Sequence, residues 1–99
     1  MSPSKYRSAN IIIQCILEGI VRADQNHMLV KKGIVKSHLI DYCGLKLSTA
    51  EKYLDKLEVA GYIVSTEEPW GKRSYTVYKI THLGEERYRW FMQINNELE

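Results

Sequence analysis

The sequence predicts a single, mostly helical α+β domain whose order is helix, helix, helix, β-hairpin, helix. Three observations support this prediction. The chain has 99 residues, which suffices for one domain with a modest core. Apolar residues recur at three- and four-residue spacing in four segments, as on one face of a helix. Between the third and fourth segments, two runs of β-forming residues flank a stretch that contains Pro69 and Gly71.

The composition excludes several classes of protein. Hydrophobic residues make up 44% of the chain and charged residues 26%, as is typical of globular domains. No apolar run approaches the roughly 20 residues of a membrane span, and the first ten residues lack the apolar stretch of a secretory signal. Two cysteines, Cys15 and Cys43, are too few for a disulfide framework. We therefore expect a cytoplasmic protein with reduced thiols and no membrane partner.

The first helix is expected to begin near Ser8 or Asn10, either of which can cap it, and to end at the polar residues 24–26. Its apolar face consists of Ile12, Ile13, Ile16, Leu17 and Ile20. Residues 1–7 are expected to form a flexible tail, and residues 27–34 a loop with at most a short extended piece.

A short second helix fits residues 36–43, with Ser37 as a candidate cap and Gly44 as the left-handed residue that ends it. The third helix is expected at about 47–60 and ends before Gly61. Its buried stripe consists of Ala50, Leu54 and Leu57.

Two strands are predicted at 62–66 and 74–80, joined by a seven-residue loop at 67–73. Thr81 can cap a last helix, at about 82–96. One side of this helix carries large apolar residues, namely Leu83, Trp90, Phe91, Ile94 and Leu98.

Two stretches carry a resemblance to known proteins. Residues 45–63 read Leu-x-Leu-Ser-Thr-Ala-x-x-Tyr-Leu-x-x-Leu-x-x-x-Gly-Tyr-Ile, and residues 78–86 read Tyr-x-Ile-Thr-x-x-Gly-Glu-Glu. With the order of elements, they resemble the recognition helix and wing of winged helix-turn-helix transcription regulators of the small archaeal type. The resemblance covers roughly residues 8–98. The sequence departs from the pattern in a longer 24–34 segment and in Lys46, where a Ser or Thr cap is common.

The resemblance implies a DNA-binding transcription regulator. The third helix would enter the major groove, and the wing at 67–73 would lie on the backbone or in the minor groove. The residues expected to contact DNA are Lys46, Ser48, Thr49, Lys52, Tyr53, Lys56, Trp70, Lys72 and Arg73. Acidic neighbours, Glu51 and Asp55 in the helix and Glu67 and Glu68 in the wing, leave a second interpretation open, in which these cations are ordinary solvated side chains.

The distribution of charge is a weaker signal. The chain carries a formal net charge of +2, with +4 in residues 1–50 and −2 in residues 51–99. The basic half could face a polyanion, and the acidic half could face solvent or a protein partner.

We expect no enzymatic activity, cofactor or metal. No nucleophile lies in an activating context and no Gly-rich phosphate loop is present. The histidines, His27, His38 and His82, have no ligand spacing with one another or with the cysteines.

A winged helix of this size does not need large apolar residues on an additional terminal helix. Such a stripe would either pack back on the first helix or meet the same stripe of a second copy, and we prefer an interface in which the first and last helices pack together across a two-fold axis. We therefore divide the chain into a tail at 1–7, a winged-helix domain at 8–81 and a dimerisation helix at 82–99. The expected dimer interface comprises Ile13, Leu83, Trp90, Phe91, Ile94 and Leu98. A two-fold dimer would suit an operator with half-sites about one helical turn apart.

Three functions remain open from the sequence. The first is a homodimeric transcription regulator that binds double-stranded DNA in the nucleoid. The second is a winged-helix module that binds protein in a larger assembly, which the acids beside each cation favour. The third is a nucleoid-associated protein that coats DNA with little sequence preference.

Overall fold

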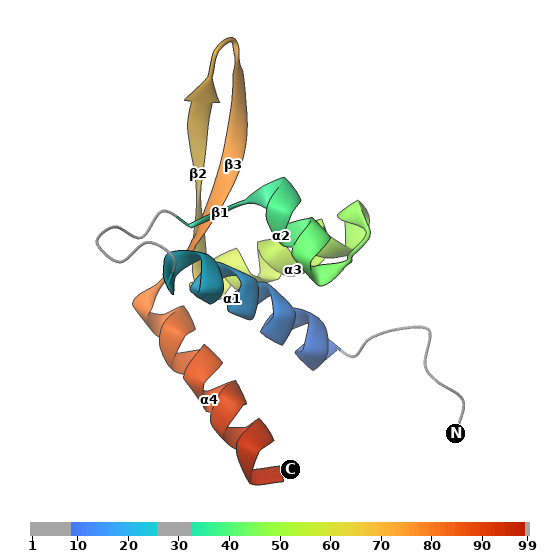
Figure 1. Cartoon of the computed structure of the whole chain (residues 1–99), viewed down its shortest axis with the longest axis vertical. Coiled ribbons are helices and arrows are strands. Elements are labelled where there is room, and N and C mark those ends of the chain that lie inside the picture. Colours follow the sequence, from blue (N-terminus) through green and yellow to red (C-terminus); the bar gives the residue numbers. More distant parts are fainter. Residues whose placement is uncertain (1–8, 26–32, 99) are drawn as a thin grey trace.

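The structure is a computed structural model that describes residues 9–25 and 33–98, without the side chains of residues 25, 95 and 98 (Figure 1). The predicted tail at 1–7 and most of the predicted loop at 27–34 lie outside the described residues. The elements are α1 (Ala9–Gln25), β1 (Ile34–Val35), α2 (Lys36–Cys43), α3 (Leu47–Val59), β2 (Ile63–Trp70), β3 (Arg73–Ile80) and α4 (His82–Leu98). This order confirms the predicted α+β class and adds one short strand, β1.

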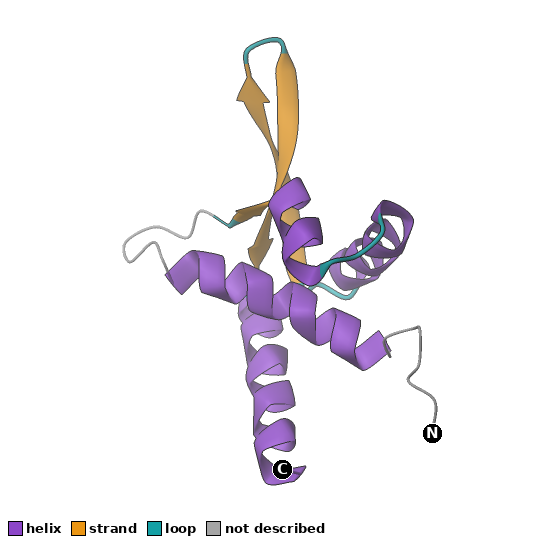
Figure 2. Cartoon of the chain, turned by 45° about the vertical axis from the view of Figure 1, so that its right-hand side comes forward, coloured by secondary structure: helices purple, strands orange, loops and turns teal. Residues whose placement is uncertain are grey.

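The molecule has a central body from which two arms project. Helices α1, α2 and α3 form the body, and the β2–β3 hairpin and α4 extend from it in opposite directions (Figures 1 and 2). The principal extents are accordingly unequal, at 50 × 30 × 24 Å. The hairpin and α4 therefore present much of their surface away from the body.

The core lies where α1 crosses the other elements. Its largest fully buried side chains come from α1, α2, α3 and β2, and are Ile16, Leu17, Ile20, Leu39, Leu54 and Ile63. The apolar stripes predicted for α1 and α3 are buried, apart from Ile13, which is half-buried. Burial of these helix faces fixes which sides of α1 and α3 remain available to other molecules.

The ends of the helices agree only in part with the ends predicted from the sequence. Gly44 ends α2 with a φ of 61°, and its N–H donates to backbone carbonyls of the last turn, as predicted. Helix α2 spans the predicted residues 36–43, but its N-cap is Val35, so Ser37 lies inside the helix and does not cap it. Lys46 occupies the N-cap of α3 and makes no side-chain cap hydrogen bond. The start of α3 therefore has no side-chain cap.

Thr81 connects α4 to the rest of the domain. Its hydroxyl oxygen accepts the N–H of Gly84 at 3.0 Å, which confirms the predicted cap. The same hydroxyl donates to the carbonyl of Gly61 at 2.6 Å. A Cβ at position 84 would collide with the carbonyl oxygen of Tyr62, so a glycine is needed for the close approach of α4 to the α3–β2 turn.

The sheet is antiparallel in the order β1-β3-β2. Strands β2 and β3 pair continuously from Ile63 with Ile80 to Trp70 with Arg73, and only residues 71 and 72 form the turn. The predicted seven-residue loop at 67–73 is therefore wrong. Proline is tolerated in an edge strand, and β2 is an edge strand of this sheet, so Pro69 continues the strand instead of ending it.

Candidate nucleic-acid interface

Helix α3 has one face in the core and one face outside. Ala50, Leu54 and Leu57 are buried, and Ser48, Lys52 and Lys56 are exposed on the opposite side. At 100° per residue, the exposed residues form a stripe along the helix axis. Lys46 is also exposed, whereas Thr49 and Tyr53 are half-buried beside the stripe. The helix thus offers the exposed polar surface that insertion into a groove requires.

One flank of α3 is cationic. The ammonium groups of Lys52 and Lys56 each lie 5.6 Å from the centroid of the Tyr53 ring. Tyr53 packs against the core, so its ring limits the positions of both lysines. Neither lysine forms an ion pair with a carboxylate of the described residues. We name Lys52 and Lys56 the cationic flank.

The other flank is acidic and faces the base of the hairpin. We name Glu51, Asp55 and Glu58 the acidic flank. Glu58 accepts a hydrogen bond from the Ser65 hydroxyl of β2 at 3.1 Å. Burial raises the pKa of Tyr78 on β3, and the negative charges of Glu58, Asp55 and Glu51 raise this pKa further.

Lys36 partly neutralises the acidic flank. Its ammonium lies 3.4 Å from a carboxylate oxygen of Glu51, in an exposed ion pair between α2 and α3. An exposed pair of this kind contributes little stability. The pair reduces the net negative charge of the acidic flank. The lysines of the cationic flank, in contrast, form no ion pair with a described carboxylate.

The hairpin, which we name the wing, carries the remaining predicted contacts at its tip. Trp70 is 72% exposed, and Lys72 and Arg73 are exposed. Trp70 therefore does not fold back against the sheet. Within the described part of the chain, neither cation forms an ion pair with a carboxylate.

Glu67 has its own partners in the wing. Its carboxylate accepts hydrogen bonds from Thr76 at 2.6 Å and from Ser74 at 3.2 Å. Because residues alternate between the two faces of a strand, Glu67 lies on the face opposite to Trp70 and Arg73. This separation weakens the interpretation in which Glu67 cancels the cations of the tip.

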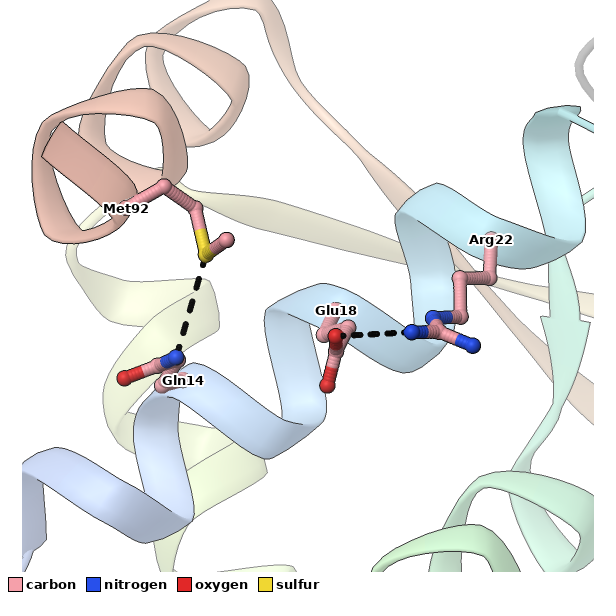
Figure 3. Close-up of polar contacts among 4 residues, drawn as sticks. All are labelled: Gln14, Glu18, Arg22 and Met92. Carbon is pink, nitrogen blue, oxygen red and sulfur yellow. Dashed lines mark hydrogen bonds and ion pairs between the residues drawn. The ribbon is translucent and has the colours of Figure 1, made fainter. Parts of the chain in front are cut away.

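Helix α4 packs against α1 through one face. The side-chain amide of Gln14 lies 3.8 Å from the sulfur of Met92 (Figure 3). Tyr88 packs against the core, and burial followed by the charge of Glu18 raises its pKa. Figure 3 also shows Glu18 paired with Arg22 at 3.2 Å along α1.

The other side of α4 is exposed and carries an apolar stripe between charged residues such as Glu86 and Arg87. Leu83, Trp90 and Ile94 are 37%, 64% and 38% exposed, and we name them the outer stripe. Phe91 and Ile13, the other predicted interface residues with described side chains, are half-buried. Leu98 belongs to α4, but its side chain lies outside the described part. The predicted dimer surface is thus divided between a face that packs within the chain and a face that does not.

Some features of this surface were not predicted from the sequence. Tyr75 and Lys79 share the Trp70 face of the wing, as the strand register places them. The pairing of Lys36 with Glu51 was also missed. Alternation of side chains along two strands that extend to the turn would have placed Tyr75 and Lys79 on the Trp70 face. Pro69 and Gly71 indicated a loop there instead.

Two further observations concern other classes of function. Within residues 9–25 and 33–98, no group of three His, Cys, Asp or Glu side chains could hold a metal ion. Among the described helices, none has the length and apolarity required to cross a membrane.

No protein-family model matches the sequence, and no curated protein is similar to it at a significant level. Solved structures are similar in fold. The transcriptional regulator PcaV from Streptomyces coelicolor superposes with a TM-score of 0.67 at 18% identity, over 81% of this chain and 52% of PcaV. This chain therefore spans about half the length of PcaV.

Two other similar structures match over more of their own length. The DNA-binding protein Sso10a-2 from Sulfolobus solfataricus gives a TM-score of 0.65 at 22% identity, over 93% of this chain and 85% of Sso10a-2. The protein smu.1704 from Streptococcus mutans UA159 gives 0.71 at 17% identity, over 96% and 86%. The chain has the winged-helix fold, which it shares with transcription regulators and DNA-binding proteins.

Proposed function

We propose that this protein is a DNA-binding transcription regulator without enzymatic activity. One observation carries the proposal: the exposed stripe of α3 presents two lysines that form no ion pair with a described carboxylate. A polyanion would replace their solvent counterions and gain from the release of its own. The similarity in fold to the DNA-binding protein Sso10a-2 supports the same function.

The charge separation of α3 favours one orientation on a duplex. The cationic flank would face a phosphate strand, while the acidic flank would stay at the base of the wing. Ser48 and Thr49 near the start of the helix would contact base edges or phosphates, with Lys46 and Tyr53 beside them. At the wing tip, Lys72 and Arg73 would contact the backbone or the minor groove, and Trp70 would pack beside them.

We propose further that the protein is a homodimer that acts in the cytoplasm on nucleoid DNA. The outer stripe of α4 would be covered by the same stripe of a second copy, related by a two-fold axis. Its three exposed side chains are all apolar, so a second apolar surface is the partner that removes most of them from water. Phe91, Ile13 and Leu98 would lie at the border of this interface.

A second candidate function is a protein-binding module of a larger assembly. The acidic flank favours it, because Glu51, Asp55 and Glu58 would repel a phosphate strand laid on that side of α3. In that case a basic protein surface would cover the acidic flank, and duplex DNA would not bind even at low salt.

Selection of bound duplexes from a random pool at about 150 mM salt tests the proposal. Enrichment of a palindrome would support a dimeric, sequence-specific regulator. Binding without enrichment would indicate a DNA-coating protein, and no binding at about 50 mM salt would favour the protein-binding module. A variant with Lys52→Ala and Lys56→Ala, passed through the same selection, is the control for retention on the matrix.

A further inference from the structure

The two faces of the wing differ in chemistry. Residues that pair across an antiparallel hairpin share a face, and successive residues alternate between faces. The inner face therefore carries the pairs Ile63–Ile80, Ser65–Tyr78, Glu67–Thr76 and Pro69–Ser74. The outer face carries Val64–Lys79, Thr66–Val77, Glu68–Tyr75 and Trp70–Arg73.

Most side chains of the inner face are buried or already hydrogen-bonded within the wing. At its base, Ile63, Tyr78 and Ile80 are buried in the core. Towards the tip, the hydroxyls of Ser74 and Thr76 donate to the Glu67 carboxylate. The only formal charge on this face is the negative charge of Glu67, which would repel phosphates.

The outer face is different near the tip. Trp70 is 72% exposed and Tyr75 is 37% exposed. They are diagonal neighbours across the hairpin, a position in which residues are about 7–8 Å apart and aromatic rings can reach each other. Arg73 lies directly opposite Trp70, and Lys72 follows in the turn. We name Trp70, Arg73 and Tyr75 the tip platform.

We propose that the tip platform binds an unpaired nucleobase of single-stranded or locally opened DNA, a role that rests on the proposed function. The flat ring of Trp70 would stack on the base, with Tyr75 beside it. Arg73 and Lys72 would contact the flanking phosphates. Aromatic rings combined with cations are the usual means of binding single strands without sequence readout. The charge of this surface is complementary to DNA, because Arg73 and Lys72 outnumber Glu68.

The competing explanation is structural: a Trp70–Tyr75 contact could simply stabilise the hairpin. The two explanations differ in what a change at position 70 affects. Loss of a stabilising contact would lower the thermal stability and weaken all DNA binding together. Loss of a stacking surface would weaken binding of unpaired DNA selectively.

The test measures fluorescence anisotropy of two labelled probes. One is oligothymidine of about 12 nucleotides, and the other is a fully paired duplex of about 20 base pairs, which covers about two helical turns. Trp70→Leu keeps an apolar side chain that can pack against a sugar but removes the flat ring. We expect its affinity for oligothymidine to fall about tenfold or more and its affinity for the duplex to change less than about threefold. Trp70→Phe should recover most of the lost affinity. Val64→Ala, at the base of the same face, is the matched control and should bind as the unchanged protein does.

Three results would overturn the inference. The first is oligothymidine binding that Trp70→Leu leaves unchanged. The second is equal loss of both probes together with a lower melting temperature, which would assign the ring to the hairpin. The third is duplex binding without any binding of oligothymidine. Absence of binding to either probe would overturn the proposed function as well, so the two failures are distinguishable.

Discussion

Helices α3 and α4 both bury one face on the domain, but each exposes a stripe of different character among its other exposed residues. The exposed stripe of α3 is polar, with Ser48, Lys52 and Lys56. The outer stripe of α4 is apolar, with Trp90 at its centre. A hydrated lysine loses little by exposure, whereas exposed apolar area costs about 25 cal/mol per Å². The comparison indicates two different partners, a polyanion for α3 and a second apolar surface for α4.

The largest effect on stability is expected at the buried face of α3, because the comparison requires that this face is anchored in the core. Leu54 of α3 is 1% exposed, and Val59 of the same helix is 89% exposed. Leu54→Ala should lower the free energy of unfolding by about 2–5 kcal/mol, because it leaves a cavity beneath α3. Val59→Ala should stay within about 0.5 kcal/mol of the unchanged protein. Urea unfolding followed by circular dichroism measures both; equal losses would mean that α3 is not anchored through this face.

The next effect concerns the outer stripe of α4. Trp90→Ala should weaken dimerisation by roughly a hundredfold, or about 3 kcal/mol over two copies, since each copy loses the burial of one large ring. Sedimentation equilibrium over a range of concentrations measures this change. Arg89→Ala alters an exposed neighbour of Trp90 and should leave the association constant within about twofold. A chain that is monomeric before any substitution would refute the role assigned to α4.

A smaller effect separates the flanks of α3. Glu51→Gln combined with Asp55→Asn removes two negative charges from the acidic flank, on the same helix as the lysines expected to contact phosphates, and releases Lys36 from its ion pair. Duplex affinity should rise about three- to tenfold, and the gain should shrink at high salt. Glu86→Gln combined with Glu97→Gln on α4 also removes two negative charges and is the charge-matched control. A fall in duplex affinity would contradict the proposed orientation, in which the acidic flank faces away from the phosphate strand.

The smallest effect is a dependence of stability on alkaline pH. Burial, and then the charges of Glu58, Asp55, Glu51 and Glu67, raise the pKa of Tyr78 above 10.0 in the folded protein. Above that pH the unfolded chain loses this proton while the folded chain keeps it, so stability falls as pH rises. Tyr78→Phe should reduce this fall without abolishing it, because the pKa values of Tyr42 and Tyr88 are raised too. Unfolding free energies at about pH 8 and pH 10.5 measure the difference; an identical fall in both proteins would argue against a buried hydroxyl beside the acidic flank.

Much of the fold could be predicted from the sequence because its signals are local. Helical spacing predicted the buried stripes of α1 and α3, and the single residues Gly44 and Thr81 marked an end and a beginning correctly. The length of the wing could not be predicted in this way. Pro69 and Gly71 indicate a turn whether or not the strands pair beyond it, and the pairing depends on contacts across the hairpin.

The candidate site shows the same limit. Helical periodicity predicted that Lys52 and Lys56 would be exposed, and they are. It also placed acids beside them, but it did not show which flank of α3 meets the wing. That arrangement depends on the turn after α3, which brings Ser65 to Glu58, and on the strand pairing that places Tyr78 opposite Ser65. The assignment of contacts to DNA remains a prediction.

The most direct test of the account is the salt dependence of duplex binding. We expect five cations to contact phosphates, namely Lys46, Lys52, Lys56, Lys72 and Arg73. A plot of log K against log salt concentration should then have a slope of roughly −4 to −5. Replacing Lys52, Lys56, Lys72 and Arg73 with alanine should reduce that slope to about −1 and the affinity by a thousandfold or more. An affinity and slope unchanged in this variant would contradict the assignment of α3 and the wing to DNA.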